Sequence, residues 1–138
     1  MYSRILVPVD LDNIHQLDKA LDLAGKTAKE HDATVIFVGV VDAVPTAATT
    51  TQGSKAHDLL DEFSAEQAYK YGIKVADHVE LRSDVHLNIG SEVIDAARKT
   101  DSDLIIMASH VPGLKDHIIS SNAGYVASNA PISVFVVR

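Results

Sequence analysis

Hydrophobic residues along this chain gather in five short runs, and the stretches between the runs repeat apolar positions at helical spacing. The runs are Ile5–Val9, Thr34–Val41, Lys74–Leu81, Leu104–Met107 and Ile132–Val137. Most are continuously apolar or β-branched, which is typical of strands buried on both faces of a parallel sheet. Pro8 has no N–H group, so we expect it at the carboxyl end of the first strand, near an edge or a bulge.

Four helices are expected between the strands. Asp12 or Asn13 is suited to cap the first, and the second is expected to end near Gly72. The third is predicted over Ser91–Thr100 and the fourth over Asn122–Ala130. The apolar positions that indicate the first three are Leu17, Ala20, Leu21, Ala24, Ala28, Ala56, Leu59, Leu60, Phe63, Val93, Ile94 and Ala97.

Two stretches carry a weaker pattern. Ala43–Gly53 holds four Thr and three Ala, and we expect it to be a mobile surface loop. Arg82–Gly90 either extends the third strand or forms a loop. Because strands alternate with helices, the sequence predicts one α/β domain over residues 1–138. We expect a five-stranded, mostly parallel sheet with helices on both faces, in three α/β/α layers.

Composition excludes several functions. The net charge is −7 with no cluster of Lys or Arg, so a nucleic-acid partner is not expected. The chain has no Cys, which excludes disulfides and thiolate chemistry. No apolar run approaches the roughly 20 residues of a membrane span, and no signal-peptide core opens the chain. A cytoplasmic protein that does not contact membranes is therefore the default expectation.

Motifs for catalysis and metal binding are also missing from the sequence. We find no HExxH motif, and no pair among the seven histidines at metal spacing with a carboxylate partner, so no metal site is expected. The GxSxG elbow, the P-loop and the GxGxxG fingerprint are absent as well. The sequence therefore predicts a binding protein rather than an enzyme.

The last third of the chain reads as strand, loop, helix and strand. The loop residues Ala108–Gly113 are mostly small, and Ser120–Ala123 stands at the expected entry of the fourth helix. Ligands of open α/β sheets sit at the carboxyl ends of the strands, and free amides at a helix N-terminus attract phosphate. We therefore expect an anion-binding edge here.

Several segments together resemble the universal stress protein family over nearly the whole length. They are Ile5–Asp10, Val38–Asp42, Asp103–His110, Ser121–Ala123 and Ala130–Arg138. The resemblance implies a Rossmann-like fold of the adenine nucleotide alpha hydrolase type. It also implies a homodimer paired through the C-terminal strand, a regulatory protein partner of unknown identity and, in one branch of the family, ATP binding.

The family's ATP motif is Gly, two residues, Gly, nine residues, Gly, then Ser or Thr. Its positions fall on Ala108, Val111, Ser121 and Asn122, and none keeps the family's residue. Val111 is the main departure, because a β-branched residue resists positive φ. Either its amide is not offered to a phosphate, or the Pro-Gly turn re-routes the loop so that Gly113 takes its place. The resemblance assigns nucleotide contacts to Pro8, Val9, Asp10, Val40, Ala108, Ser109, His110, Val111, Gly113, Ser121, Asn122 and Ala123.

Each of these residues also has a plainer interpretation. Ser121 and Asn122 are favoured as helix N-caps with or without a ligand, and Val40 is an ordinary core residue type. Three functions therefore stay open. The first is a nucleotide-binding regulatory dimer that takes ATP with Mg²⁺; the second is a dimer that acts through protein contacts alone. A slow ATPase or autophosphorylating protein is the third.

Overall fold

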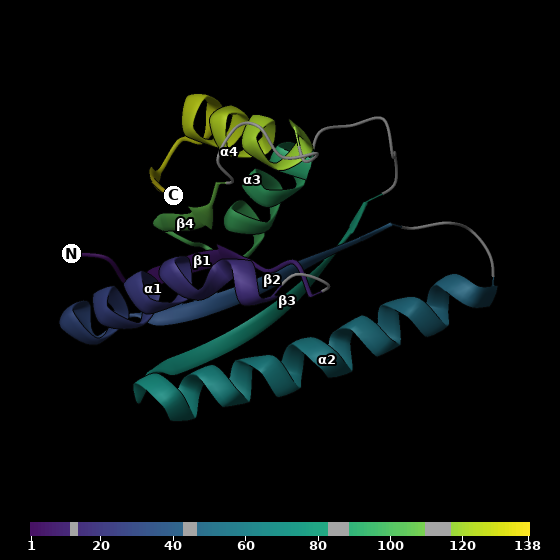
Figure 1. Ribbon diagram of the computed structural model, residues 1–138, viewed down its shortest axis with the longest axis horizontal. Helices are drawn as coiled ribbons and strands as arrows, with labels where there is room; N and C mark the ends of the chain where they lie inside the picture. The colour runs from purple at the N-terminus through teal and green to yellow at the C-terminus, as the bar shows by residue number, and fades with distance from the viewer. Residues whose placement is uncertain (12–13, 43–46, 83–88, 110–116) are drawn as a thin grey trace.

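The computed structural model of the chain describes residues 1–11, 14–42, 47–82, 89–109 and 117–138 (Figure 1). Its elements are β1 (Arg4–Pro8), the 3₁₀ turn η1 (Ile14–Leu17), α1 (Asp18–His31), β2 (Thr34–Asp42), α2 (Ala47–Tyr71), β3 (Lys74–Arg82), α3 (Ile89–Lys99), β4 (Leu104–Ala108), α4 (His117–Asn129) and β5 (Ser133–Val137). The proposed caps Asp12 and Asn13 lie outside the described residues.

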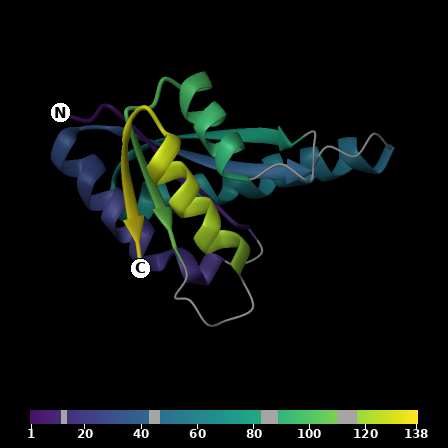
Figure 2. The same cartoon turned by 90° about the horizontal axis from the view of Figure 1, so that it is seen from above.

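The five strands form one sheet in the order β3-β2-β1-β4-β5. All four neighbouring pairs are parallel, which confirms the predicted sheet. β1 is the central strand, so the expectation that Pro8 lies near an edge is wrong, although it is the last residue of its strand. β4 and β5 lie side by side at one end of the sheet, with the C-terminus at the tip of β5 (Figure 2).

Two hydrophobic clusters hold helices on opposite faces of the sheet, as the alternation of apolar runs predicts. Leu21 of α1 and Phe63 of α2 pack with Ile5 of β1 in the first cluster. Val93 of α3 and Val126 of α4 pack with the next β1 residue, Leu6, in the second cluster. Because side chains of a strand alternate between faces, β1 anchors both layers. The fold is the three-layer α/β/α arrangement expected.

α2 is longer than the sequence pattern indicates. It begins at Ala47, so the expectation of a loop over Ala43–Gly53 is wrong for residues 47–53; residues 43–46 lie outside the described part. These residues have no apolar stripe to indicate a helix. Adding turns to an existing helix is cheap once its packed half is formed, and Ala is the best helix former. The buried residues Leu60 and Phe63 anchor the packed half of α2, and the helix extends from there back to Ala47.

Other boundaries differ by smaller amounts. The sequence left Arg82–Gly90 open between strand and loop. In the structure β3 ends at Arg82 and α3 begins at Ile89. β2 and β3 stay paired up to Asp42 and Arg82, well past the end of β1, and α2 runs beside this extension (Figure 1). Among the described residues, no helix is long and apolar enough to cross a membrane.

Candidate functional site

The carboxyl ends of β1 and β4 part from each other at the middle of the sheet. The two strands pair only over Ile5–Leu6 and Leu104–Ile105. The chain leaves β1 toward β2 on one side, and leaves β4 toward β5 on the other. This is the topological switch point of an open α/β sheet, where ligands bind in the crevice outside the strand ends.

Each of the two strands keeps its outer partner beyond the point of separation. The amide of Val9 donates to the carbonyl of Val38 on β2 at 2.8 Å. The amide of Ser109 donates to the carbonyl of Val137 on β5 at 2.7 Å. The opening is therefore confined to the space between β1 and β4, and both of its walls are fixed by neighbouring strands.

Pro8 explains why this ladder stops. Backbone N–H groups of a strand point alternately to its two neighbours. Since the Val9 amide points to β2, residue 8 faces β4, and proline has no N–H to donate there. The sequence argument placed the missing donor at an outer edge; the structure places it on the crevice side of the central strand.

The structure brings four of the predicted site residues to this edge of the sheet. Pro8 ends β1 and Ala108 ends β4, while Asp10 and Ser109 come just after these strands. All four residues are partly exposed. Val9 is only 6% exposed and packs in the cluster beneath α1 and α2. A ligand in the crevice would therefore meet the backbone of Val9 and not its side chain.

The residues assigned to the entry of the fourth helix occupy a different place. α4 begins at His117, so the predicted start at Asn122 and the N-cap interpretation of Ser121 and Asn122 are wrong. Only the first four amides of a helix lack an internal partner, and residues 121–123 come after them. Asn122 is 5% exposed. Ala123 is 1% exposed and packs in the cluster beneath α3 and α4.

The other predicted nucleotide contacts have side chains outside the described part of the chain. Val40 belongs to β2 and Ser121 to α4, but only their backbone lies in the described part of the chain. His110, Val111 and Gly113 lie outside the described residues. The question whether Gly113 replaces the motif glycine at position 111 therefore stays a prediction.

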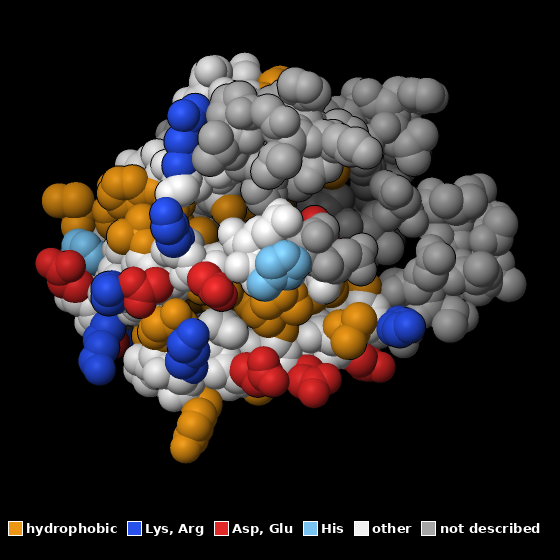
Figure 3. All heavy atoms as spheres, in the orientation of Figure 1, with side chains coloured by type: hydrophobic (Ala, Val, Ile, Leu, Met, Phe, Trp, Pro, Cys, Tyr) orange, Lys and Arg blue, Asp and Glu red, His pale blue; other side chains and the backbone are white. Residues whose placement is uncertain are grey.

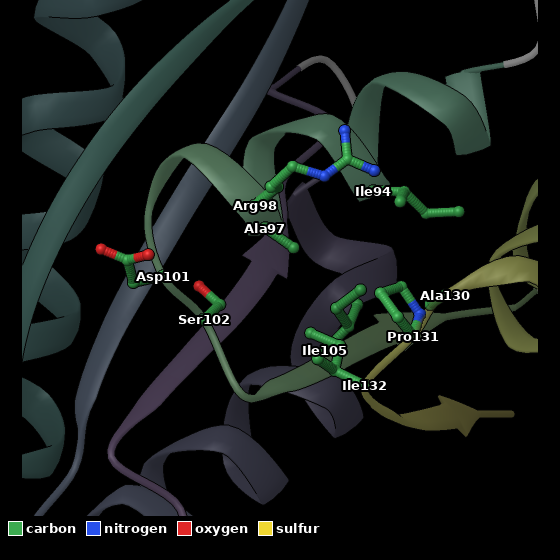
Figure 4. Close-up of a pocket in the computed structure, with 9 residues that line it drawn as sticks. All are labelled: Ile94, Ala97, Arg98, Asp101, Ser102, Ile105, Ala130, Pro131 and Ile132. Carbon is green, nitrogen blue, oxygen red and sulfur yellow. The ribbon is translucent and has the colours of Figure 1, made fainter.

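A separate hollow of about 290 Å³ lies at the opposite end of β4, between α3 and the turn that leads into β5 (Figure 4). Ile94, Ile105, Pro131 and Ile132 make its walls largely apolar. Arg98 lies at its rim, but its guanidinium is already bound to the Asp95 carboxylate at 2.9 Å. This hollow is at the amino ends of the strands, away from the edge where parallel sheets bind ligands.

A model of the universal stress protein family matches residues 1–138. The chain belongs to the universal stress protein family. It is 30% identical to universal stress protein MJ0531 of Methanocaldococcus jannaschii, over the whole of this chain and 83% of the relative. The resemblance drawn from the strand and loop segments is therefore confirmed for the whole chain.

Solved structures confirm the fold of this universal stress protein. The universal stress protein from Archaeoglobus fulgidus superposes with a TM-score of 0.76 at 19% identity, with complete coverage of both chains. A universal stress protein in complex with cAMP has a TM-score of 0.74 at 16% identity, covering 99% of this chain and 97% of that one. The Archaeoglobus fulgidus protein in complex with dAMP has a TM-score of 0.72 at 19% identity, covering 99% and 98%.

Sequence analysis missed one cluster of titratable side chains. His57 and Asp61 on α2 meet Asp77 on β3, and one ligand atom from each lies within 4.8 Å of the others. Burial is the main cause that raises the pKa of Asp77, and the neighbouring Asp61 carboxyl raises it further. The pKa of Asp61 is lowered, mainly by its hydrogen bond with Asp77. The i, i+4 spacing of His57 and Asp61 was visible in the sequence; the approach of β3 was not.

Proposed function

We propose that this universal stress protein binds an adenine nucleotide in the crevice between β1 and β4, and that it acts as a dimeric regulatory module and not as an enzyme. One observation carries the proposal. The β1–β4 ladder ends at Leu6 and Ile105 while both strands keep their outer partners. This leaves open the edge at which α/β sheets take nucleotides. The cAMP and dAMP complexes of two proteins with the same fold support it.

The proposal gives the parts of the ligand separate places. The base and ribose lie near Asp10 and the end of β2 at Val40. The phosphates lie over Ala108 and Ser109 and reach toward the first turn of α4, which begins at His117, because the first amides of a helix have no partner within it and attract anions. This moves the helix contribution away from Ser121–Ala123. Since the chain carries a net charge of −7, ATP would enter with Mg²⁺.

A dimer that acts through protein contacts alone is the second candidate, and a specific observation favours it. Asn122 and Ala123 belong to the middle of α4, and both side chains are buried. The family motif would need these residues at the entry of the helix, where their amides could contact a phosphate. Slow hydrolysis or autophosphorylation is a weaker third candidate. A turnover assay with Mg-ATP separates it from binding.

The decisive experiment is calorimetric titration of the full chain with Mg-ATP, ADP, cAMP and dAMP, using wild type and two variants of Ser109. Ser109→Glu adds a negative charge at the β4 rim, and Ser109→Gln adds a side chain of the same size without the charge. We expect phosphate binding to weaken at least tenfold in Ser109→Glu and much less in Ser109→Gln. If both variants lost affinity equally, the larger side chain at position 109 would be blocking the site by its size. The phosphates would then not lie beside Ser109.

Absence of heat with every nucleotide at millimolar concentration would overturn the nucleotide proposal and leave the protein-contact module. Mass spectrometry of the protein as isolated gives a second test, because a co-purified adenine nucleotide is direct support. Gly113→Val tests the replacement of the motif glycine separately. Binding that survives this change excludes the Gly113 amide as a phosphate contact.

The proposed dimer is formed by β5. This strand is at the edge of the sheet, and Phe135 and Val136 are 47% and 41% exposed. A long apolar edge strand is a template for pairing with another chain. Two-fold symmetry lets β5 of one copy pair antiparallel with β5 of the other and cover both edges at once.

A further inference from the structure

Asp77 occupies a position on β3 where an apolar side chain would be expected. Val75 packs against the cluster beneath α1 and α2, and side chains two residues apart on a strand share a face. Asp77 therefore points toward the helix layer, beside its register partner Phe37. Its side chain is 21% exposed. A carboxylate in such a place costs free energy unless it has a partner.

The nearest polar groups come from α2. The Nδ1 atom of His57 is 3.3 Å from an Asp61 carboxylate oxygen and 3.9 Å from Oδ2 of Asp77. The three residues come from two elements that pack against each other, so their approach is a product of the tertiary fold. The exposed face of this part of α2 adds further carboxylates, and Figure 3 shows acidic side chains gathered there.

The three groups satisfy one another only in part. Oδ2 of Asp77 is fully buried and has no hydrogen-bond partner among the described atoms. The carboxyl beside it, Asp61, can only accept when it is ionised, and two carboxylates side by side repel. The site needs a positive charge, which either a proton or a bound cation can supply.

We propose that His57, Asp61 and Asp77 bind a divalent transition-metal ion of the Zn²⁺ type. Imidazole nitrogen together with carboxylate oxygen suits Zn²⁺ better than Mg²⁺ or Ca²⁺, which prefer oxygen alone. Bonds of about 2.05 Å in a tetrahedron place ligand atoms about 3.3 Å apart. The His57–Asp61 separation of 3.3 Å has this value. The 3.9 Å from His57 to Asp77, within a trio whose ligand atoms lie no more than 4.8 Å apart, shortens on binding by rotation of the side chains.

This site is independent of the proposed nucleotide crevice. It lies between α2 and the edge strand β3, whereas the crevice lies between β1 and β4. His57 and Asp61 are 58% and 53% exposed, so the ion has open access and water completes its coordination. Binding would link α2 to β3 through a bridging ion.

The test is titration of tag-free, nucleotide-free protein with ZnCl₂ by calorimetry in a buffer that does not chelate metals. His57→Gln and Asp61→Asn each remove one ligand and should weaken Zn²⁺ binding at least tenfold. Asp58→Asn is a matched control, since it removes an equal charge from an exposed neighbour on the same helix. His15→Gln controls for histidine outside the site. Both controls should bind as wild type does.

Circular dichroism establishes that each variant is folded before titration. Asp77→Asn gives an independent check, because it removes the buried ligand while easing the like-charge contact; we expect a stable protein that has lost Zn²⁺ binding. Unchanged affinity in His57→Gln and Asp61→Asn would overturn the site, as would an equal loss in Asp58→Asn. Mg²⁺ binding with the same dependence on the variants would overturn the choice of a transition metal.

Discussion

The carboxylate of Asp103, just before β4, accepts the backbone amide of Ser3 with both of its oxygens, at 2.8 and 3.1 Å. It also accepts the amide of Arg4 at 3.0 Å, and its own amide donates to the Arg4 carbonyl at 2.9 Å. β1 and β4 are thus clamped together at their amino ends. The same two strands separate at their carboxyl ends, where the nucleotide is proposed to bind.

Removing this clamp should destabilise the protein. In Asp103→Ala the amides of Ser3 and Arg4 lose a charged acceptor, and hydrogen bonds to charged groups contribute about 1.5–3 kcal/mol. We expect urea denaturation to show a loss of about 2 kcal/mol. Asp95→Ala, which breaks an exposed ion pair with Arg98, should change stability by less than about 0.5 kcal/mol. Similar losses in both variants would contradict the clamp.

Two helical glycines should respond in opposite directions to the same substitution. A Cβ at Gly25 of α1 would lie 2.6 Å from the ring of Tyr71, whereas a Cβ at Gly124 of α4 meets nothing within 4 Å. Gly25→Ala should therefore lower stability by about 1–3 kcal/mol. Gly124→Ala should raise it by about 0.5–1 kcal/mol, because alanine is the better helix former. Thermal melts of the two variants test the close contact between α1 and the end of α2, and equal melting temperatures would refute it.

Asp77→Asn should stabilise the metal-free protein at neutral pH. Because the pKa of Asp77 is raised in the folded state, the folded protein holds its proton more tightly than the unfolded chain does. That contribution is complete below the ordinary value of 3.8 and is lost as the pH rises through the folded-state pKa. The side-chain amide introduced by Asp77→Asn can donate a hydrogen bond to Asp61 at any pH. The variant therefore does not lose this stability as the pH rises, and we expect its free energy of unfolding at pH 7 to exceed that of wild type by about 1 kcal/mol.

The measurement is urea denaturation in the presence of a chelator at several pH values. The difference between Asp77→Asn and wild type should be small near pH 3 and should grow toward pH 7. A difference that stays constant with pH, or falls as the pH rises, would show that the Asp77 carboxyl is not held protonated by its surroundings.

A proline at an outward-facing position of β5 should prevent dimer formation without unfolding the protein. The carbonyl of Val137 accepts a hydrogen bond from the amide of Ser109, just after β4. The N–H groups of Ser133, Phe135 and Val137 therefore point to the β4 side, and that of Val136 points outward. Val136→Pro removes only an outward donor. Light scattering should show a folded monomer for this variant and a dimer for the control Val136→Thr, which keeps the N–H. A wild-type monomer at micromolar concentration would contradict pairing through β5.

Much of the fold could be predicted because its apolar runs are local signals. The runs around Ile5, Ile36 and Ile105 identify buried parallel strands, and positions such as Leu21 and Val93 identify the inner faces of helices. The beginnings of α2 and α4 could not be found in this way. Residues 47–53 carry no apolar stripe, and Ser121 and Asn122 have the side chains of a helix cap although they lie inside a helix.

The candidate site was predictable only as an edge of the sheet. Asp10 and Ser109 follow apolar runs, and the ends of parallel strands meet at one edge, so sequence alone places them there. The role of Pro8 depends on which neighbour residue 8 faces, and that follows from strand order. The contact of Asp77 with His57 likewise depends on how α2 packs on β3, which no spacing in the sequence encodes.

The shared extension of β2 and β3 beyond β1 has a consequence for the shape of the assembly. β3 and β5 are the two outer strands of the sheet, so joining two copies through β5 would make a continuous sheet of ten strands, about 45 Å across. Both extensions, each with an α2 of 25 residues, would then sit at the far ends of that span. The dimer would be elongated and would sediment more slowly than a sphere of its mass. Its two equivalent β2–β3 extensions would lie far apart, where two partner molecules could bind at the same time.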